Sequence, residues 1–495
     1  MWQRYLAALA GGAILPLAFA PFGIWTLAIV SPAVLLLVVR GISVPRAALA
    51  GWLYGLGMFG CGVWWVQVSI HQFGVPYYAF SVSVTAVFIA IMACYPALFA
   101  GLMNALSPRQ ETWCLIISAP ALWVLTEWLR ATLFTGFPWL SLGYSQIDSP
   151  LAGFAPIVGI YGCSLMAVAI AAAVVALVFS ASTVRVTIAI AIGAIVIGGE
   201  RLTHTDWTRA AGQELTVALV QGAVPQAVKW HADVRQPSIE LYQSLTEPHW
   251  DADIVIWPET AIPAFPFDVP DTIQVLQDRA SETNTDLLIG MLSGEPREQR
   301  YFNSIIDLGS TPGRYDKRHL VPFGEVFPLK GFMRDFSRLL NIPMSDFTPG
   351  REDQTTVEVA GYAAGLSICY EDAFPREIAR ALPGAAFLVN VSNDAWFGDT
   401  IAPHQHLEIA RMRALETGRY LLRGTNTGIT AVIDHRGKIV AQSAQFEPSS
   451  LRAGLIPRTG ITPYTRLGDR PLLAALLLIV VLAAIESRRR AARKK

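Results

Sequence analysis

The sequence predicts an α-helical bundle of about eight membrane spans joined to an α/β domain. Hydrophobic side chains make up 53% of the 495 residues and charged ones only 15%, with a mean hydropathy of +0.41, whereas soluble proteins carry about 25% charged residues. Only ten of the 38 basic and 38 acidic side chains lie in the first 200 residues. We therefore expect a membrane domain with about seven helices at 1–200, a globular domain at 205–470, and a final membrane helix with a basic tail at 471–495.

Eight apolar stretches are candidates for the membrane helices. A hydrocarbon core of ~30 Å requires about 20 apolar residues in a helix. The first two stretches are short for this purpose and contain Pro16 and Pro32. The eight stretches cover residues 5–20, 24–39, 47–69, 77–102, 113–131, 155–179, 184–199 and 471–485.

Basic residues in the short connections predict the orientation of these helices. Those that fall on one side of the membrane are Arg4, Arg40, Arg46, Arg109, Arg185 and the basic tail after residue 487. The connections on the other side contain only Arg130. Because basic loops stay in the cytoplasm, we expect both termini to be cytoplasmic. Seven crossings then place residues 205–470 on the opposite face.

Charge and glycine patterns exclude two classes of ligand. The formal net charge is zero, so no overall positive field is available to bind nucleic acid. The run Gly55-Leu-Gly-Met-Phe-Gly60 matches a dinucleotide-binding pattern, but it lies in an apolar stretch with no strand before it. We expect Gly51 and Gly55 to permit close helix packing instead.

A second pair of residues in the membrane half is unusual because it is charged. Glu127 is the only carboxylate well inside an apolar stretch, and Arg130 follows three residues later. Side chains at this spacing meet on one face of a helix. We expect a structural ion pair near the outer end of the helix.

From residue 205 onward, short apolar runs alternate with helical patterns, which is typical of an α/β layered domain. The runs expected to form strands are 215–220, 253–257, 287–292, 303–308, 364–369, 386–391, 429–434 and 438–441. The expected helices are 234–246, 271–283, 375–382 and 404–418.

Three segments of this half carry candidate catalytic residues. Cys369 is the one cysteine of the globular domain, and it ends an apolar run that is followed by Tyr370, Glu371 and Asp372. Glu259 follows another such run after Pro258, which we expect to end the strand. A third segment contains Lys317 and Glu325. Because α/β sheets place reactive groups at strand ends, we expect these side chains to meet.

Physical chemistry suggests roles for three of these residues. A thiol is only a few per cent ionised at neutral pH, so a carboxylate that accepts its proton raises the reactive fraction. Glu259 is suited to act on Cys369 in this way. An attacked ester carbonyl develops negative charge on its oxygen, which a buried ammonium such as that of Lys317 would stabilise.

Several motifs carry a resemblance to a known family. In chain order they are GFPWLSLGYSQ (136–146), WPET (257–260), DKRHLVPFGE (316–325), SICYED (367–372), SNDAWFG (392–398) and RMRALETGR (411–419). Three of these resemble the Glu/Lys/Cys signature of the nitrilase, or carbon–nitrogen hydrolase, superfamily. Together with the membrane half, the chain resembles the apolipoprotein N-acyltransferases, a family of bacterial inner-membrane enzymes.

The resemblance implies a fold and a set of site residues. It implies a nitrilase-like αββα sandwich in the periplasm, with Cys369 as nucleophile, Glu259 as general base and Lys317 beside the oxyanion. Glu325, Tyr370 and Glu371 match further positions that shape the site. Trp230, at the end of QGAVPQAVKW (221–230), matches a position that is associated with lipid binding.

The resemblance also implies the reaction. The sn-1 acyl chain of a phospholipid, typically phosphatidylethanolamine, passes through a thioester on the cysteine to the amine of a diacylglyceryl apolipoprotein. This completes lipoprotein maturation and proceeds by ping-pong kinetics. No cofactor and no metal are expected.

Alternative interpretations remain open at this point. The chain could be a membrane-tethered nitrilase-type amidase that releases its acyl group to water, or a catalytically dead nitrilase-like scaffold. His404 and His406 could be a metal pair, or His404 could form a dyad with Cys369, although neither spacing is diagnostic. Basic and aromatic residues alternate by helical spacing over 323–347, which indicates either a helix at the membrane surface or one packed on its own domain.

Overall fold

The computed structural model describes residues 1–74, 77–106, 112–295, 297, 300–322, 324–326 and 347–492. These residues form two compact units. The first, here called the helical unit, comprises Met1–Gln67, Tyr77–Thr205 and Leu467–Lys495, and the second, the sheet unit, comprises Val68–Pro76 and Asp206–Arg466. Nearly all of the amphipathic stretch 323–347 lies outside the described residues.

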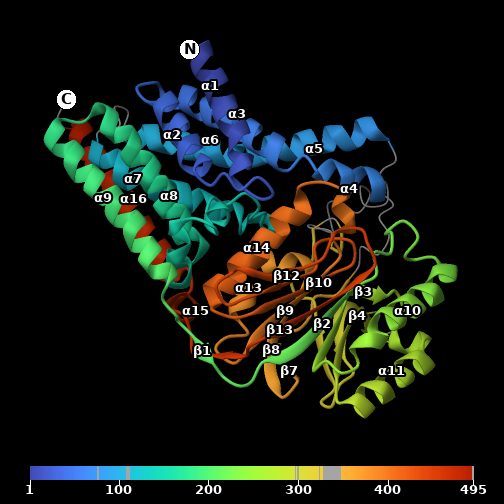
Figure 1. Cartoon of the computed structure of the whole chain (residues 1–495). Helices are drawn as coiled ribbons and strands as arrows, with labels where there is room; N and C mark the ends of the chain where they lie inside the picture. The colour runs from blue at the N-terminus through green and yellow to red at the C-terminus, as the bar shows by residue number, and fades with distance from the viewer. Residues whose placement is uncertain are drawn as a thin grey trace. The chain divides into compact units, whose positions relative to one another are not determined.

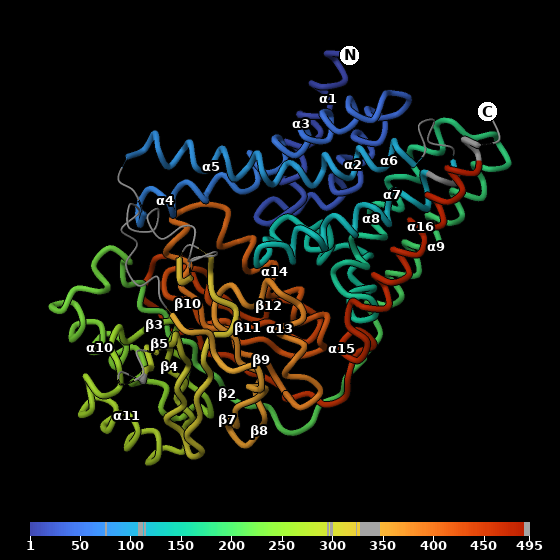
Figure 2. The backbone as a smooth tube through the Cα atoms, turned by 180° about the vertical axis from the view of Figure 1, so that it is seen from behind, coloured from blue at the N-terminus to red at the C-terminus, as the bar shows by residue number. Residues whose placement is uncertain are grey.

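The helical unit is built from the N-terminal part of the chain and completed by the last helix (Figure 1). Its helices are α1 (Trp2–Ile14), α2 (Leu27–Val39), α3 (Val44–Gly62), α5 (Tyr78–Met92), α6 (Cys94–Leu106), α7 (Thr112–Arg130), α8 (Ala155–Phe179), α9 (Ser182–Thr203) and α16 (Arg470–Ala492). Helix α4 (Val66–Phe73) begins in this unit, but most of it belongs to the sheet unit. Helix α16, in red, packs against α7 and so joins the helices of the N-terminal part of the chain (Figures 1 and 2). The C-terminal helix therefore returns to the unit in which the chain begins.

Four helical segments of the described residues are long and apolar enough to cross a membrane. They are Tyr78–Leu106, Pro150–Phe179, Ser182–Thr203 and Arg470–Arg489, and α3 with α4 makes a fifth if this pair, bent by 59°, is one span. Helices α1 and α2 have 13 residues each, which corresponds to about 20 Å at 1.5 Å per residue. The eight spans expected from the sequence therefore stay a prediction.

Glycines allow the helices of this unit to approach closely. A Cβ atom on Gly12 would lie 1.9 Å from the Tyr54 carbonyl oxygen, and one on Gly51 would lie 2.4 Å from the Pro96 carbonyl oxygen. At Gly55 the nearest atom would be the Cα of Ala93, at 2.6 Å. These distances confirm the packing role expected for Gly51 and Gly55.

Glu127 and Arg130 are both buried and hold the loop that follows α7. Glu127 Oε1 accepts hydrogen bonds from the Leu142 amide at 2.8 Å and from the Trp123 indole at 2.9 Å. Arg130 donates to the carbonyl oxygens of Phe137 (2.8 Å) and Trp139. Both side chains thus fix the segment 136–146. The ion pair expected between them does not form among the described residues, because each side chain is bonded to other groups.

The sheet unit contains two six-stranded sheets. One has the order β12-β11-β10-β9-β8-β7, and the other has the order β13-β2-β3-β4-β5-β6. The first is formed by β7 (Val357–Val359), β8 (Tyr362–Ile368), β9 (Phe387–Ser392), β10 (Leu421–Thr425), β11 (Ala431–Ile433) and β12 (Ile439–Gln442). The second is formed by β2 (Leu215–Gln221), β3 (Ile254–Ile262), β4 (Asp286–Glu295), β5 (Arg300–Asp307), β6 (Gly313–Asp316) and β13 (Ser449–Leu455), while β1 (Arg209–Ala210) pairs with β14 (Arg458–Thr459).

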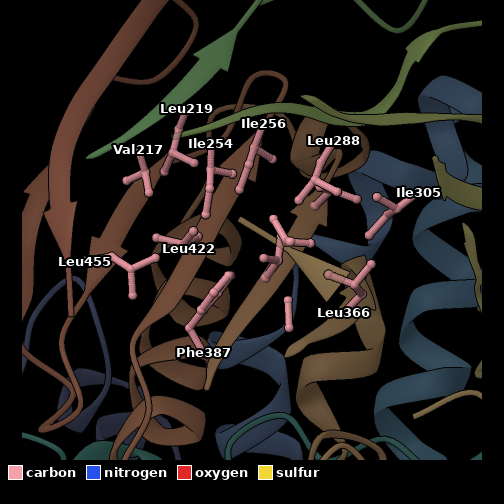
Figure 3. Close-up of a cluster of buried hydrophobic side chains, with 14 of the residues drawn as sticks. Val217, Leu219, Ile254, Ile256, Leu288, Ile305, Leu366, Phe387, Leu422 and Leu455 are labelled. Carbon is pink, nitrogen blue, oxygen red and sulfur yellow. The ribbon is translucent and has the colours of Figure 1, made fainter. Parts of the chain in front are cut away.

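The two sheets pack face to face between helices, which makes four layers. Side chains of both sheets form one apolar cluster, which includes Ile254, Leu288, Phe387 and Leu422 (Figure 3). A second cluster joins the sheet of β2–β5 to α10 (Ala232–Thr246) and α11 (Pro270–Thr283). A third joins the other sheet to α13 (Pro375–Ala379) and α14 (Ala402–Thr417). This is the αββα sandwich that the sequence resemblance implies.

Strand β3 differs from the prediction because Pro258 does not end it. The strand continues to Ile262, and its pairing with β4 shifts register between Trp257 and Ile262. Thr260 has a φ of +53°, which is the left-handed conformation rarely adopted by a β-branched residue. An irregular strand of this kind can contain a proline that a regular central strand cannot.

The sequence prediction also missed four of the strands in the two large sheets, which are β6, β7, β10 and β13. Strand β10 reads Leu-Leu-Arg-Gly-Thr and contains a fully buried arginine, Arg423. Arginine and glycine are unfavourable in a buried strand by composition alone. The partners that make Arg423 acceptable there come from other elements of the sheet unit.

Candidate active site

Cys369 lies at a sharp turn immediately after β8. Its φ is +52°, a left-handed conformation that is strained for a non-glycine residue and is typical of functional sites. The side chain is 8% exposed. The thiol therefore lies at the carboxyl end of strand β8, where the turn fixes its position.

Glu259, in the irregular part of β3, is the carboxylate that acts most strongly on this thiol. Its Oε1 accepts a hydrogen bond from Asn303 Nδ2 at 2.7 Å and lies 3.5 Å from Lys317 Nζ. Its Oε2 is buried and has no hydrogen-bond partner among the residues that the structure describes. One carboxylate oxygen is thus held in place while the other can accept a proton.

Lys317 follows β6 and is 1% exposed. Its Nζ is 2.9 Å from Glu325 Oε1 and 3.5 Å from Glu259 Oε1. Burial alone would lower the pKa of Lys317, but the charges of Glu325 and Glu259 outweigh that effect and raise it above its ordinary value. Lys317 therefore stays an ammonium at every physiological pH.

The thiol of Cys369 is correspondingly hard to ionise. Burial raises the pKa of Cys369 well above its ordinary value, and the Glu259 carboxylate raises it further. The Lys317 ammonium lowers it in part. A thiolate must therefore form together with proton transfer to a nearby base, and Glu259 is the carboxylate with the largest electrostatic effect on the thiol.

Glu371 is fully buried and connects the segments of Cys369 and Lys317. Its carboxylate accepts hydrogen bonds from the amides of Ile368 (2.7 Å), Arg318 (2.8 Å) and His319 (3.1 Å). The hydroxyl of Tyr315 also donates to both carboxylate oxygens, at 3.0 and 3.1 Å. Glu371 thus fixes the distance between the residue before the cysteine and the residues after the lysine.

The two aromatic residues predicted for the site lie at its periphery. Tyr370 follows the cysteine and packs edge-on against Phe374, with ring centroids 5.0 Å apart. Trp230 lies just before α10 and is 40% exposed. The structure thus brings Glu259, Lys317, Glu325 and Cys369 together, and leaves Trp230 free to contact a substrate.

A buried group of four charged residues lies beneath the cysteine turn. His406 contacts Asp394 through Nδ1 at 2.8 Å and Asp372 through Nε2 at 2.9 Å. Arg423 donates to Asp394 at 2.9 Å and to Asp372 at 3.2 Å. Since both ring nitrogens of His406 are bonded to carboxylates, this histidine is available neither as a general base nor as half of a metal pair with His404.

Burial of this charged group changes the protonation of its members. Burial and the nearby guanidinium would lower the pKa of His406, but the two carboxylates outweigh both effects and raise it from its ordinary value of 6.5 to about 9. Asp394 has a lowered pKa, because its cationic partners outweigh the effect of burial. His406 is therefore protonated and Asp394 is ionised at neutral pH.

Sequence reasoning missed Asn303, Lys229 and Arg423. Asn303 orients Glu259, and Lys229 donates from Nζ to the Glu259 carbonyl oxygen at 3.0 Å. Lys229 stands beside Trp230 in the motif that the sequence analysis quoted, but nothing in the local pattern indicates that its side chain is buried.

Two family models match the chain. One is described as the apolipoprotein N-acyltransferase N-terminal domain and matches residues 11–174. The other is described as carbon–nitrogen hydrolase and matches residues 216–463. The first match lies within the helical part of the chain, and the second contains every residue of the candidate site.

Relatives with similar length and order of segments are known from several bacteria. Proteins named apolipoprotein N-acyltransferase from Methylococcus capsulatus, Coxiella burnetii and Vibrio cholerae are 43%, 44% and 42% identical to the chain. Each comparison covers 95% of this chain, and 94%, 97% and 94% of the respective relative. Among solved structures, Saccharomyces cerevisiae Nit3, a member of the nitrilase superfamily, is 21% identical with a TM-score of 0.38, covering 50% of this chain and 93% of that one.

Proposed function

The chain belongs to the apolipoprotein N-acyltransferase family, and from this premise we propose that Cys369 carries the acyl group as a thioester between the two substrates. The protein is a membrane acyltransferase that acts on a lipoprotein acceptor with a phospholipid donor. The proposed donor is phosphatidylethanolamine, which gives up its sn-1 acyl chain. The proposed acceptor group is the α-amine of a diacylglyceryl cysteine.

In the first half-reaction, the thiol attacks the ester carbonyl of the donor. Glu259 Oε2 takes the thiol proton as the bond between Sγ and the carbonyl carbon forms. The bond to the glycerol oxygen then breaks, and the proton on Glu259 passes to that oxygen. The products are a thioester on Cys369 and a lysophospholipid.

In the second half-reaction, the amine of the lipoprotein attacks the thioester. Glu259 accepts a proton from the attacking nitrogen, the carbon–nitrogen bond forms and the carbon–sulfur bond breaks. The proton held by Glu259 returns to the departing sulfur. This sequence yields an amide and the free enzyme, and it predicts ping-pong kinetics.

Lys317 is the proposed stabiliser of the negative oxygen in both halves. An ammonium has three donors, and two of those on Lys317 face Glu325 and Glu259. The third would serve the oxyanion. Loss of one such donor costs roughly 3–4 kcal/mol in other acyl-transfer enzymes.

The free Oε2 atom of Glu259 is the observation that carries this proposal. A buried carboxylate oxygen without a partner is costly, and a thiol whose pKa is raised lies within its electrostatic reach. A transferable proton on Cys369 would satisfy that oxygen. Glu325, Tyr370 and Glu371 are proposed to shape the site around these two groups, and Trp230 to contact lipid.

We further propose an arrangement in the membrane. The chain would cross the bacterial inner membrane eight times, with both termini in the cytoplasm and the catalytic domain in the periplasm. The domain boundaries would lie near residues 200–205 and 470. The asymmetry of basic residues in the short connections supports this orientation.

The test is acylation of the purified protein by phosphatidylethanolamine labelled in its sn-1 chain. Intact-mass analysis should show one acyl chain, removable by hydroxylamine, that maps to Cys369. Addition of a diacylglyceryl peptide should then move the label into an amide. Cys61→Ser is a matched control that should leave the adduct unchanged.

Three results would contradict the proposal. Label that appears only as free fatty acid would indicate an amidase-like hydrolase that transfers to water. An adduct that persists in Cys369→Ala would assign the acyl group to another residue. Cells that mature their lipoproteins normally with Cys369→Ser would indicate a catalytically dead scaffold.

A further inference from the structure

Lys229 is a buried lysine beside the proposed general base, and the mechanism above does not use it. Its side chain is 1% exposed, whereas that of its neighbour Trp230 is 40% exposed. The ammonium donates a hydrogen bond to the main-chain oxygen of Glu259 at 3.0 Å. Among the described residues, Glu259 is also the only charged group that acts on it electrostatically.

The main chain at Glu259 needs such a partner because β3 is irregular there. Its pairing with β4 shifts between Trp257 and Ile262, and Thr260 has a φ of +53°. Carbonyl groups in a shifted segment leave the regular ladder and need other donors. The Lys229 ammonium supplies the donor for the carbonyl of Glu259.

The same lysine belongs to the segment that carries Trp230. At its beginning, this segment is held by Asn426, which accepts from the Val224 amide at 3.0 Å and donates to the Val224 oxygen at 2.8 Å. In its middle, Gln226 accepts from Asn393 Nδ2 at 2.7 Å. At its end, the hydrogen bond of Lys229 to Glu259 is the corresponding tether.

The cost of burying Lys229 indicates that it does more than fill space. Burial lowers the pKa of Lys229 from its ordinary value of 10.5 to about 8, although the Glu259 carboxylate acts in the opposite direction. A methionine has a side chain of similar length without a charge to bury. Lys229 keeps a charge whose burial destabilises the fold, and its ammonium donates to the carbonyl of Glu259. Residues that lower stability in this way are commonly kept for activity.

We propose that Lys229 is a positioning residue of the acyl-transfer reaction, which fixes the main chain of Glu259 and ties the general base to the segment that carries Trp230. The inference rests on the proposed roles of Glu259 and Cys369. Without the tether, Glu259 Oε2 would be poorly aligned with the thiol. Acylation would then be slower but would still occur.

Protonation of Lys229 gives this role a signature in the pH profile. The ammonium form makes a charge-assisted hydrogen bond, which is stronger than that of a neutral amine. Glu259 acts on Lys229, and Glu259 is itself surrounded by Lys317, Glu325 and Cys369. The positive charges of Lys229 and Lys317 offset the negative charge of the carboxylates of Glu259 and Glu325. When Lys229 loses its proton, the site gains net negative charge, which disfavours formation of a thiolate on Cys369.

The experiment measures the rate constant of Cys369 acylation by phosphatidylethanolamine in mixed micelles between pH 6.5 and 9.5. For the unmodified full-length enzyme we expect the rate constant to fall as the pH rises through about 8. Lys229→Met should be slower by on the order of 10-fold to 100-fold at pH 7 and should lack this fall. Lys229→Arg, which keeps its charge, should retain its rate at pH 9, and the exposed Lys438→Met should behave as the unmodified enzyme.

Either of two results would overturn the inference. One is a rate constant of the unmodified enzyme that does not fall between pH 7 and 9, which needs no variant to fold. The other is a folded Lys229→Met protein with unchanged rate and pH profile. If Cys369→Ala abolishes the adduct in the same assay, only the inference about Lys229 fails, whereas an adduct on Cys369→Ala would defeat the proposed function itself.

Discussion

At Cys369, burial and the neighbouring carboxylate oppose ionisation, and the Lys317 ammonium favours it. The balance keeps the thiol protonated in the resting enzyme. Because thiolates are the forms that oxidise, a protonated thiol is protected until a substrate is bound. In the proposed mechanism, reactivity comes from the aligned base Glu259 rather than from a lowered thiol pKa.

Replacement of Glu259 by Gln tests this arrangement. The amide keeps the size of the side chain but cannot accept the thiol proton, so we expect acylation of Cys369 to slow by about 10²–10⁴-fold. Intact-mass analysis over time measures the adduct. Glu282→Gln, an exposed glutamate on α11, is the matched control. Retained activity in Glu259→Gln would favour a histidine base.

The charged group beneath the cysteine predicts a pH dependence of stability. The pKa of His406 is raised to about 9 from 6.5, which corresponds to about 3 kcal/mol. A raised pKa stabilises the folded protein fully below about pH 6.5, and this contribution is lost as the pH rises through about 9.

The expected result is a difference in melting temperature between unmodified enzyme and His406→Gln that is large at pH 6 and shrinks toward pH 9.5. Titrating groups that do not contact His406, such as Lys229, contribute to both proteins and cancel in this difference. Differential scanning calorimetry at several pH values makes the measurement. A difference that stays constant over this range would show that His406 is not charged in the folded state.

At the scale of elements, the strand ends were predictable and the long-range partners were not. Glu259 and Cys369 each follow an apolar run, and such runs are visible in sequence. Arg423 lies within β10, and its partners Asp372 and Asp394 come from a turn and a loop 51 and 29 positions away. No local pattern indicates that a buried arginine in a strand is paired with aspartates so far away in the sequence.

The irregular part of β3 is a second feature that local sequence patterns could not predict. Pro258 is a strand breaker by composition, but the strand continues beyond it with a shifted register. The shift depends on Gly290 in β4, where a Cβ atom would lie 2.2 Å from the Pro258 oxygen and 2.7 Å from Glu259 Cα. A close approach between two strands is a tertiary property, so residues 254–262 could not be assigned from their own sequence.

Gly290→Ala tests whether this close approach positions the base. The added methyl group must displace Pro258 or Glu259, and overpacking of this kind costs about 1–3 kcal/mol. We expect a lower melting temperature and acylation slowed by roughly 10-fold or more, since small displacements of reacting groups are costly. Gly384→Ala is the control, because its nearest neighbours would be at 3.7 Å or more. Normal acylation in Gly290→Ala would show that β3 can shift without loss of alignment.

At the scale of the whole molecule, the chain begins in the helical unit, forms the sheet unit and returns to the helical unit through α16. Composition predicted this order, because the density of charged residues changes sharply near residue 200. The number of spans was harder to predict, since α1 and α2 are short and α3 and α4 are bent relative to each other. Short and bent helices satisfy their backbone hydrogen bonds as long ones do, so hydropathy alone does not give their count.

The proposed topology predicts which positions a membrane-impermeant maleimide can reach in intact spheroplasts. Ser281→Cys is exposed on α11 of the sheet unit, and Arg488→Cys is exposed near the end of α16. In a background that lacks Cys61 and Cys94, we expect the first to be labelled before lysis and the second only after it. In the proposed topology, seven spans before residue 205 place position 281 outside the cytoplasm, and the span formed by α16 returns position 488 to it. Measuring label on both variants in lysed cells controls for accessibility. Labelling of both positions before lysis would mean that α16 does not carry the chain across the membrane. The catalytic domain would then share a compartment with the basic tail.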